Sequence, residues 1–426
     1  MKKYFFDNYN IIYFRLLFIT VSVFFLSKLC TSYEIIIGDG WAYNNLFINY
    51  SAGFVRRGLL GELFLFVNET FDVKPLVFFT NVLFIAYSLY VIFFYNLLKK
   101  YSEYKFFVTF IVLSPVLILF YIYEQNVFLS KDIFINVIIL FHAFIINKVI
   151  NVKNYIKFLY FILIPTLTLS IFNHENQVFF IPFHLLITCY FFSEKKVEVF
   201  KLNILKPYLI LIIPVIIIFL SSGSFEKLSI INSTISKFDA KIYDQFAGNL
   251  NLAIGGFIKW HFFFHTVNDF LRLFFCVLIS FLVIYLVFDF LVKNKVLKIS
   301  IKLSNKYIFI ILPSFLILFI MLDHGRSLNL LSVHIISFYL ILKIDHKKLK
   351  NLFAKINDHF FYKKILIVFL TFYLNFWFLP QGGGFTGIGN FTTIFKGTLL
   401  NEIKIIFLIV FNYIDSEIIN LPRIII

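Results

Sequence analysis

Residues 76–98 of the chain read LVFFTNVLFIAYSLYVIFFYNLL and contain no charged side chain. A helix of about 20 such residues crosses a hydrocarbon core about 30 Å thick. The rest of the 426-residue chain continues the pattern, since 60% of all residues are hydrophobic and 21% are aromatic. Soluble domains have only about 45–50% apolar residues. The composition therefore predicts an integral membrane protein and excludes a water-soluble domain.

Further apolar stretches occur on both sides of this segment, with no soluble domain and no repeat between them. They lie at 11–30, 106–123, 133–147, 158–172, 178–193, 208–220, 271–292, 307–322, 328–344 and 365–380, with a shorter one at 404–414. We predict an all-α fold, a polytopic membrane helix bundle of about 11–12 transmembrane helices with re-entrant or interfacial outer loops. The whole chain, 1–426, forms a single integral membrane domain in this interpretation.

The basic residues predict the orientation of that bundle. Alternate connections hold 24 Lys and Arg residues on the side of the N-terminus and 11 on the other side. Because the more basic loops stay on the cytoplasmic side, the N-terminus is expected in the cytoplasm. The net charge of +16 then reflects topology and contact with anionic lipid headgroups. No nucleic-acid partner is expected.

Glycine is distributed unevenly in this topology. All 16 glycines fall in segments assigned to the outer face, chiefly the loops 31–75, 221–268 and 381–403. Glycine permits positive φ and close approach of the backbone to a ligand, and loops carry function more often than the elements they connect. We therefore expect the working surface on the outer face, built from these three loops.

The first outer loop contains two candidate groups of residues. Asp39 stands between two glycines and is followed by Trp41, so its carboxylate has little steric cover and can act as a base toward a bound hydroxyl. Arg56 and Arg57 also lie between glycines and suit an anionic ligand at the headgroup plane. The structural alternative is a turn beside two arginines that reach lipid phosphates.

Two tight outer connections carry the remaining candidates. Residues 323–326 read DHGR, in which Asp323 and Arg326 have the spacing to pair across one helical turn beside His324. Residues 173–177 read NHENQ and offer His174 and Glu175 as a substrate contact and a base. Val178 occupies the position of the second histidine of a zinc-protease motif, so that motif is absent. A capping ion pair and a solvated loop are the structural alternatives.

The sequence predicts no metal and no cofactor. His261, His265 and Asp269 share a helical stripe, but three phenylalanines among them favour an interfacial aromatic belt. The glycine-rich run 381–389 lacks the Lys and Ser or Thr of a nucleotide-binding loop. Three cysteines have no paired spacing that would indicate a disulfide or metal site. The span histidines, His142, His184 and His334, are expected to be hydrogen-bonded in the interior.

These residues together resemble a known group of proteins. An outer loop with an exposed Asp, the segment FVRRGLLG at 54–61 and the HEN and DHGR connections resemble Wzy-type O-antigen polymerases of bacterial surface-polysaccharide pathways. More broadly, the chain is similar to polytopic membrane glycosyltransferases of the GT-C class. The resemblance covers the whole chain in topology and short motifs in sequence.

The resemblance implies location in the bacterial inner membrane, multi-pass, and transfer between sugars carried on undecaprenyl lipid at the periplasmic face. It implies that Arg56, Arg57 and Arg326 neutralise the diphosphate leaving group. One of the carboxylates Asp39, Glu175 and Asp323 would accept the proton, and Trp41, His174 and His324 would contact substrate. The implied partners are an undecaprenyl-linked oligosaccharide, membrane lipid and a chain-length regulator or other polysaccharide-assembly protein.

Two other functions stay open at this stage. A GT-C enzyme that adds one sugar from a polyprenyl-phosphate donor would use Asp39 in the first outer loop as its catalytic carboxylate. A flippase for lipid-linked oligosaccharide belongs to a different class. Transporters usually have charged or broken-helix sites near mid-membrane and repeated halves, neither of which the sequence indicates.

Overall fold

The computed structural model describes most of the first 242 residues and parts of the remainder. The described residues are 2–36, 41–114, 116–123, 127–149, 151–195, 202–221, 225–242, 308–320, 324–345, 347–348 and 351, with short pieces at 277, 281, 284–285, 289, 294, 297–298, 377–378 and 388–389. The predicted spans 271–292 and 365–380 and the stretch 404–414 lie largely or wholly outside these residues. So do most of the outer loops 221–268 and 381–403.

The described chain is almost entirely helical. Its α-helices are α1 (Lys2–Ile36), α2 (Trp41–Asn44), α3 (Leu59–Phe71), α4 (Pro75–Leu98), α5 (Lys105–Val112), α6 (Phe120–Tyr123), α7 (Asp132–Lys148), α8 (Val152–Phe158), α9 (Ile164–Asn173), α10 (Gln177–Glu194), α11 (Leu202–Ile210), α12 (Ile212–Leu220), α13 (Phe225–Ile235), α18 (Ile308–Ile311), α19 (Ile317–Ile320) and α20 (His324–Ile341). Two-residue strands form two antiparallel pairs, β1 (Leu297–Lys298) with β2 (Lys343–Ile344) and β3 (Trp377–Phe378) with β4 (Ile388–Gly389).

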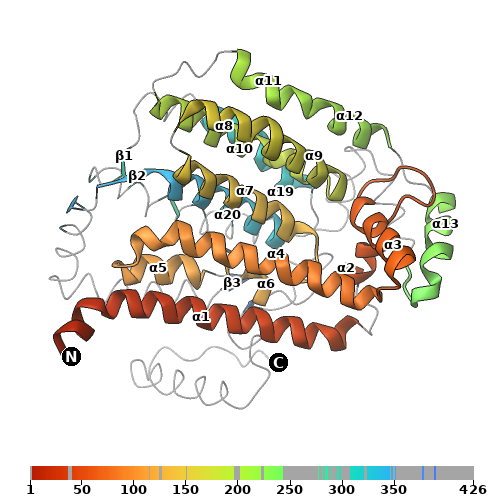
Figure 1. Cartoon of the computed structure of the whole chain (residues 1–426), viewed down its shortest axis with the longest axis horizontal. Helices are drawn as coiled ribbons and strands as arrows, with labels where there is room; N and C mark the ends of the chain where they lie inside the picture. Colours follow the sequence, from red (N-terminus) through yellow and green to blue (C-terminus); the bar gives the residue numbers. More distant parts are fainter. Residues whose placement is uncertain are drawn as a thin grey trace, which may run out of the picture.

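The long helices lie side by side with their axes roughly aligned (Figure 1). α4 packs between α1 and α7, α7 packs against α20, and α10 contacts both α7 and α20. The short helices α2, α3 and α13 gather at one end of this array. α3 is formed by part of the first outer loop, directly after Gly58.

Among the residues that the structure describes, four helices are long and apolar enough to cross a membrane. They are Asn10–Leu29, Pro75–Tyr101, Val152–Asn173 and Gln177–Glu194. A fifth span results if the bent pair Lys206–Leu220 and Phe225–Phe238, which turns by 97°, is counted as one. The described part of the chain thus confirms apolar helices of membrane-spanning length, and the larger predicted number of spans stays a prediction.

The surface of α1 shows why such helices suit lipid. One face is buried, with Phe14, Phe18 and Phe25 at 4% exposure or less. The opposite face carries Leu16 and Ile19, which are 57% and 58% exposed. A helix that is apolar on both its buried and its exposed faces is typical of a membrane span, because water would disfavour the exposed face.

The predicted span 106–123 is wrong as a single helix. α5 ends at Val112, and residues 116–119 form turns before the single helical turn of α6. The sequence has a proline at position 115. Proline lacks an N–H donor and disfavours helical geometry at the preceding residue, which explains the break. Turn backbone inside the helix array requires polar partners, and α4 and α20 supply them.

Pro165 has a different effect. The helix continues through it from Val152 to Asn173, but residues Leu159–Leu163 just before it form a π-helical turn. A proline leaves one carbonyl of the preceding turn without its donor and crowds that turn. The wider π turn accommodates the ring without ending the span.

Buried amides tie the broken segment to the central helices. Asn136 on α7 donates to Asn329 Oδ1 on α20 over 2.8 Å and to Tyr121 Oη over 3.0 Å. Asn329 in turn donates to the carbonyls of Val116 and Leu117, both at 3.1 Å. Apolar side chains gain little from leaving lipid, so interhelical hydrogen bonds of this kind contribute to packing specificity in membranes.

We predict that Asn136→Leu lowers the stability of the purified protein by about 1 kcal/mol, because it leaves Asn329 Oδ1 without its donor in an apolar interior. Thermal unfolding in detergent measures the effect. Asn96→Leu is the matched control, since Asn96 lies on an exposed face of α4 and bonds only its own helix. Equal midpoints for the two variants would contradict the prediction.

Candidate functional site

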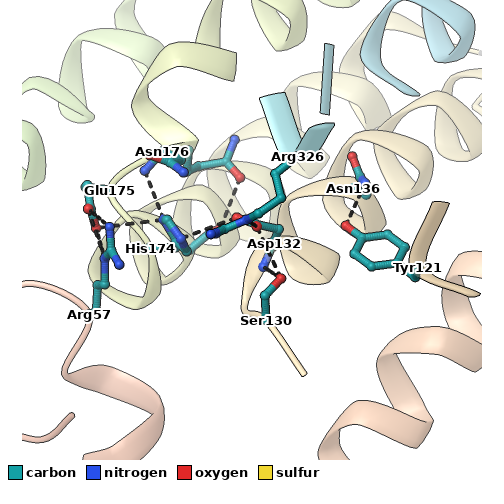
Figure 2. Close-up of polar contacts among 11 residues, drawn as sticks. Arg57, Tyr121, Ser130, Asp132, Asn136, His174, Glu175, Asn176 and Arg326 are labelled. Carbon is teal, nitrogen blue, oxygen red and sulfur yellow. Dashed lines mark hydrogen bonds and ion pairs between the residues drawn. The ribbon is translucent and has the colours of Figure 1, made fainter. Parts of the chain in front are cut away.

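Side chains from four separate segments meet at the end of the helices near α3 (Figures 1 and 2). Arg57 comes from the loop before α3, and Ser130, Lys131 and Asp132 come from the start of α7. His174, Glu175 and Asn176 form the turn between α9 and α10, and Arg326 lies in the first turn of α20. Arg57, Glu175 and Arg326 were expected on one face of the membrane, and the structure brings them into one network.

Local contacts hold the loop that carries Arg57. The N–H of Tyr50 donates to Glu62 of α3 over 2.9 Å, and Gly53 turns the chain with φ +82°. Gly61 allows α3 to pack directly on the preceding segment, because a Cβ there would lie 2.2 Å from the carbonyl oxygen of Ile48. The glycines of this loop therefore serve a turn and a close backbone approach.

Arg57 is paired with Glu175. Its Nε lies 2.9 Å and 2.8 Å from the two carboxylate oxygens, and its Nη2 also bonds Oε1. Arg57 has φ +66°, a left-handed conformation that is uncommon for a residue with a side chain. Lys131 Nζ holds this backbone by donating to the Arg57 carbonyl over 2.6 Å. Strained backbone of this kind clusters at functional sites.

Asp132 is the centre of the buried half of the network. Its carboxylate accepts from Arg326 Nε at 2.5 Å and from the Ser130 hydroxyl at 3.1 Å. His174 Nε2 lies 3.3 Å from the other carboxylate oxygen. The side chain of Asp132 is 1% exposed. A carboxylate buried this deeply stays ionised only when paired and hydrogen-bonded. Arg326 and Ser130 bond Oδ2, whereas Oδ1 faces His174 and has no hydrogen-bond partner among the described residues.

The tautomer of His174 follows from its neighbours. The backbone N–H of Asn176 donates to His174 Nδ1 over 3.2 Å, so Nδ1 carries the lone pair. Nε2 therefore carries the proton and faces Asp132. Nδ1 accepts this bond and Nε2 lies 3.3 Å from Asp132, so His174 orients the 174–176 turn beside Asp132, and its predicted contact with substrate stays a prediction.

The two carboxylates are held ionised. Burial by itself raises the pKa of Glu175, but Arg57 and then His174 outweigh it and hold the pKa well below the usual range. For Asp132, burial likewise raises the pKa, and Arg326 with His174 lowers it below its ordinary value. Both are weak bases in this state, because a carboxylate with a low pKa gives up its charge reluctantly.

The two bases next to them are shifted toward neutrality. Burial lowers the pKa of His174 to about 4, with Arg57 adding to the effect against Asp132 and Glu175. Burial and the charge of Arg57 lower the pKa of Lys131 to about 7. Lys131 therefore changes charge near neutral pH. The net charge of the site is for this reason sensitive to an anion bound close by.

The two ion pairs differ in access. The side chains of Arg57 and Glu175 are 20% and 17% exposed, whereas Asp132 is 1% and His174 4% exposed. The Arg57–Glu175 pair is the part that a ligand from outside reaches first. The Asp132 group lies behind it and positions the segments that carry it.

The structure places some predicted site residues only in part. Asp39 and Asp323 lie outside the described residues. Trp41 begins α2 and His324 begins α20, but their side chains are likewise outside the description. Arg56 is half-buried beside Arg57, and burial lowers its pKa while Glu175 opposes that effect. Their predicted roles stay predictions.

The DHGR segment was interpreted as a tight connection in which Arg326 has the spacing to pair with Asp323 across one helical turn. Asp323 lies outside the described residues, so that pairing stays a prediction. The structure begins a helix at His324, and Arg326 reaches across to Asp132 on α7. A side chain in the first turn of a helix can meet a neighbouring helix, so Arg326 also has a partner distant in sequence.

Sequence reasoning missed Asp132 and Lys131. They form a charged pair directly before the apolar stretch 133–147, a position where charges usually meet headgroups. One feature of the sequence does point to them. They lie in a connection of only a few residues, on the same predicted face as two other short connections that carry charges. A short connection keeps its charged residues at the helix ends, where neighbouring segments meet.

We predict that the stability of the protein rises with pH between about 7 and 10.5 because of Lys131. The pKa of Lys131 is about 7 in the folded chain and 10.5 ordinarily, so the unfolded chain binds the extra proton in this window. The slope from this group is at most about 1.4 kcal/mol per pH unit. Thermal midpoints measured across this range should rise less in Lys131→Met, and parallel curves would refute the assignment.

Comparison of the chain with models of protein families, with curated proteins and with solved structures finds no match.

Proposed function

We propose that the chain is a membrane glycosyltransferase that acts on undecaprenyl-linked sugars, specifically a surface-polysaccharide polymerase of the O-antigen type. In this proposal it is a bundle of about 11–12 helices in the bacterial inner membrane, with the N-terminus in the cytoplasm and the site on the periplasmic face. Its partners are the lipid-linked oligosaccharide and a chain-length regulator or other assembly protein.

The observation that carries the proposal is the partly exposed Arg57–Glu175 pair at the end of apolar helices, held by a buried network from three other segments. A lipid-linked diphosphate has its charged group at the same depth as a helix end and its chain in the hydrocarbon. Arginine binds phosphate oxygens in a two-point geometry that lysine does not match. Arg57 bonds Glu175 through Nε and Nη2, and its Nη1 takes no part in that pair.

The reaction assigns distinct tasks to these groups. An acceptor hydroxyl oxygen bonds to the anomeric carbon, the bond from that carbon to the diphosphate oxygen breaks, and the hydroxyl proton passes to a base. Arg57 stabilises the negative charge that develops on the diphosphate, with Arg326 supporting the site through Asp132. Positive charge on Lys131 increases when an anion binds next to it, which adds to this stabilisation.

Among the proposed bases, Glu175 is the least suited while it is paired with Arg57. An arriving diphosphate competes with Glu175 for the guanidinium of Arg57. If Glu175 loses its pairing with Arg57, it becomes more basic. In the sequence Asp39 stands two residues before α2, and α2 lies at the end of the helix array near the network (Figure 1). Asp39 is therefore the first choice as proton acceptor, and Asp323 the second.

A GT-C enzyme adding a single sugar from a polyprenyl-phosphate donor is the second candidate. The position of Asp39 in the first outer loop favours it, since that class resembles this chain in having a carboxylate there. The two functions differ in product, so they are separated by the length distribution of the glycan.

Deletion of the gene in its host, complemented with plasmid copies, tests the proposal through gel analysis of surface glycolipid. We predict that Arg57→Ala and Asp39→Ala each reduce the long-chain ladder by at least about tenfold while single-repeat product persists, because each removes transition-state stabilisation or the proton acceptor. Lys343→Ala is the matched control. It removes an ion pair with Glu194, at the opposite end of α10 from Glu175.

The alternatives predict other products. An unchanged ladder with one missing side-branch sugar would favour the single-sugar transferase. Repeat units that accumulate on the cytoplasmic face would favour the flippase. A normal ladder in both variants at normal protein levels would contradict the assigned site.

A further inference from the structure

A second polar group lies inside the helix array, apart from the candidate site. Its members are His142 on α7, Tyr155 on α8, His184 and Thr188 on α10, and Tyr208 on α11, all of them buried. The two histidines face each other, with their Nδ1 atoms 3.0 Å apart. Polar residues within membrane spans are candidates for a function. The proposed transfer reaction uses none of these five residues.

One carbonyl sets the direction of the hydroxyl protons. The Tyr208 hydroxyl lies 3.0 Å from the His184 carbonyl oxygen, which only accepts, so Tyr208 donates. Its single proton is then used, and Thr188 must donate to Tyr208 over 2.7 Å. By the same reasoning Tyr155 donates to Thr188 over 2.8 Å.

The histidine tautomers follow from that chain. Since the Tyr155 proton is used, His142 Nε2 carries a proton and donates to Tyr155 over 2.7 Å. His142 is neutral, so its Nδ1 is a lone pair that accepts from His184 Nδ1–H. This leaves the lone pair of His184 on Nε2. That nitrogen is buried and has no hydrogen-bond partner among the described residues.

His334 on α20 has the same arrangement. Its Nδ1 donates to the Leu330 carbonyl over 2.7 Å, which puts the lone pair on Nε2. This Nε2 is also buried and without a partner in the described part of the chain. The rings of His334 and His184 have centroids 6.3 Å apart and planes at 82°. Two neutral imidazoles thus offer lone pairs inside an apolar interior that supplies no donor.

We propose that His184 and His334 form a binding site for a soft monovalent metal ion, of the class of Cu(I). Histidines that ligate metals donate their other ring N–H to a carbonyl or a similar acceptor, which fixes the tautomer. Both histidines meet that condition. Two nitrogens each about 2 Å from an ion on the line between the rings place the ring centroids about 6 Å apart, and the observed separation is 6.3 Å.

The surroundings select the class of ion. The described residues contain no group of three or more His, Cys, Asp or Glu side chains placed for a metal. The described residues therefore offer an ion at this site two protein ligands, a number that Cu(I) accepts and that Zn²⁺ does not prefer. The ligands are neutral, and burying one positive charge costs far less than burying two. Phe180 covers the site, with its ring 4.2 Å from that of His334.

The sequence predicts three hydrogen-bonded histidines in the interior and no metal. All three are hydrogen-bonded, but among the described contacts only His142 of the three has both ring nitrogens engaged. Because the lone pairs of His184 and His334 are already free of protons, the ion binds without displacing one. The inference is independent of the proposed transfer reaction, since it uses no residue of the Arg57–Glu175 network.

The test uses the full-length chain purified in detergent. Cu(I) is supplied under ascorbate, excess is removed by competition with bathocuproine, and the copper retained per chain is measured by mass spectrometry. We expect one copper ion in the wild type and loss of most of it in His184→Gln and His334→Gln. Asn96→Leu changes an exposed side chain on α4 outside both networks and should retain copper. X-ray absorption should report two nitrogen ligands.

Two further measurements guard against variants that fail to fold. His334→Met keeps a soft ligand and should retain copper, and Cu(I) should raise the thermal midpoint of the wild type but not of His334→Gln. The proposal is overturned if the wild type retains no more copper than the double variant His184→Gln/His334→Gln. Equal loss in Asn96→Leu, or a preference for Zn²⁺, would overturn it as well.

Discussion

The ionised carboxylate of Asp132 is the constraint on which the site depends. At 1% exposure it requires compensation, and Arg326, His174 and Ser130 each supply a contact from a defined direction. A buried charge that loses one partner is strongly destabilised, so the start of α7, the 174–176 turn and the first turn of α20 must remain together. The Arg57 loop joins this assembly through Glu175 and Lys131.

The residues that hold the site together differ from the residues that a ligand can reach. The carboxylate of Asp132 is buried, and its Oδ2 bonds Arg326 and Ser130 from other segments. The Arg57–Glu175 pair is the outer layer, reachable and backed by a strained backbone that Lys131 holds. Rigid backing of a charged group is what preorganised stabilisation of an anion requires. The histidine cluster between α10 and α20 is a separate feature, built from hydroxyl and imidazole groups without formal charge.

Several features of the fold follow from the sequence alone, and the predictions fail at particular positions. The apolar run 76–98 is helical, and the NHENQ segment is a tight connection between two long helices. Hydropathy fails at 106–123, because apolar content does not show that α5 ends near Pro115. A charged residue close to a glycine was the criterion that identified Arg57. Asp132 does not meet this criterion, because its role depends on which residues it contacts. Glu175 was found by its type, and its pairing with Arg57 across 118 positions was not predictable.

The sequence by itself determined the membrane environment and the placement of charge. Both depend on which side chains occur along the chain and not on how the helices pack. The tertiary structure decided the pairing of Arg326 with Asp132 and of Arg57 with Glu175, and the neutral tautomers of His184 and His334. The physical reason is that ionisation and hydrogen bonding in a low-dielectric interior depend on which groups lie within about 3 Å of each other. That distance is set by helix packing.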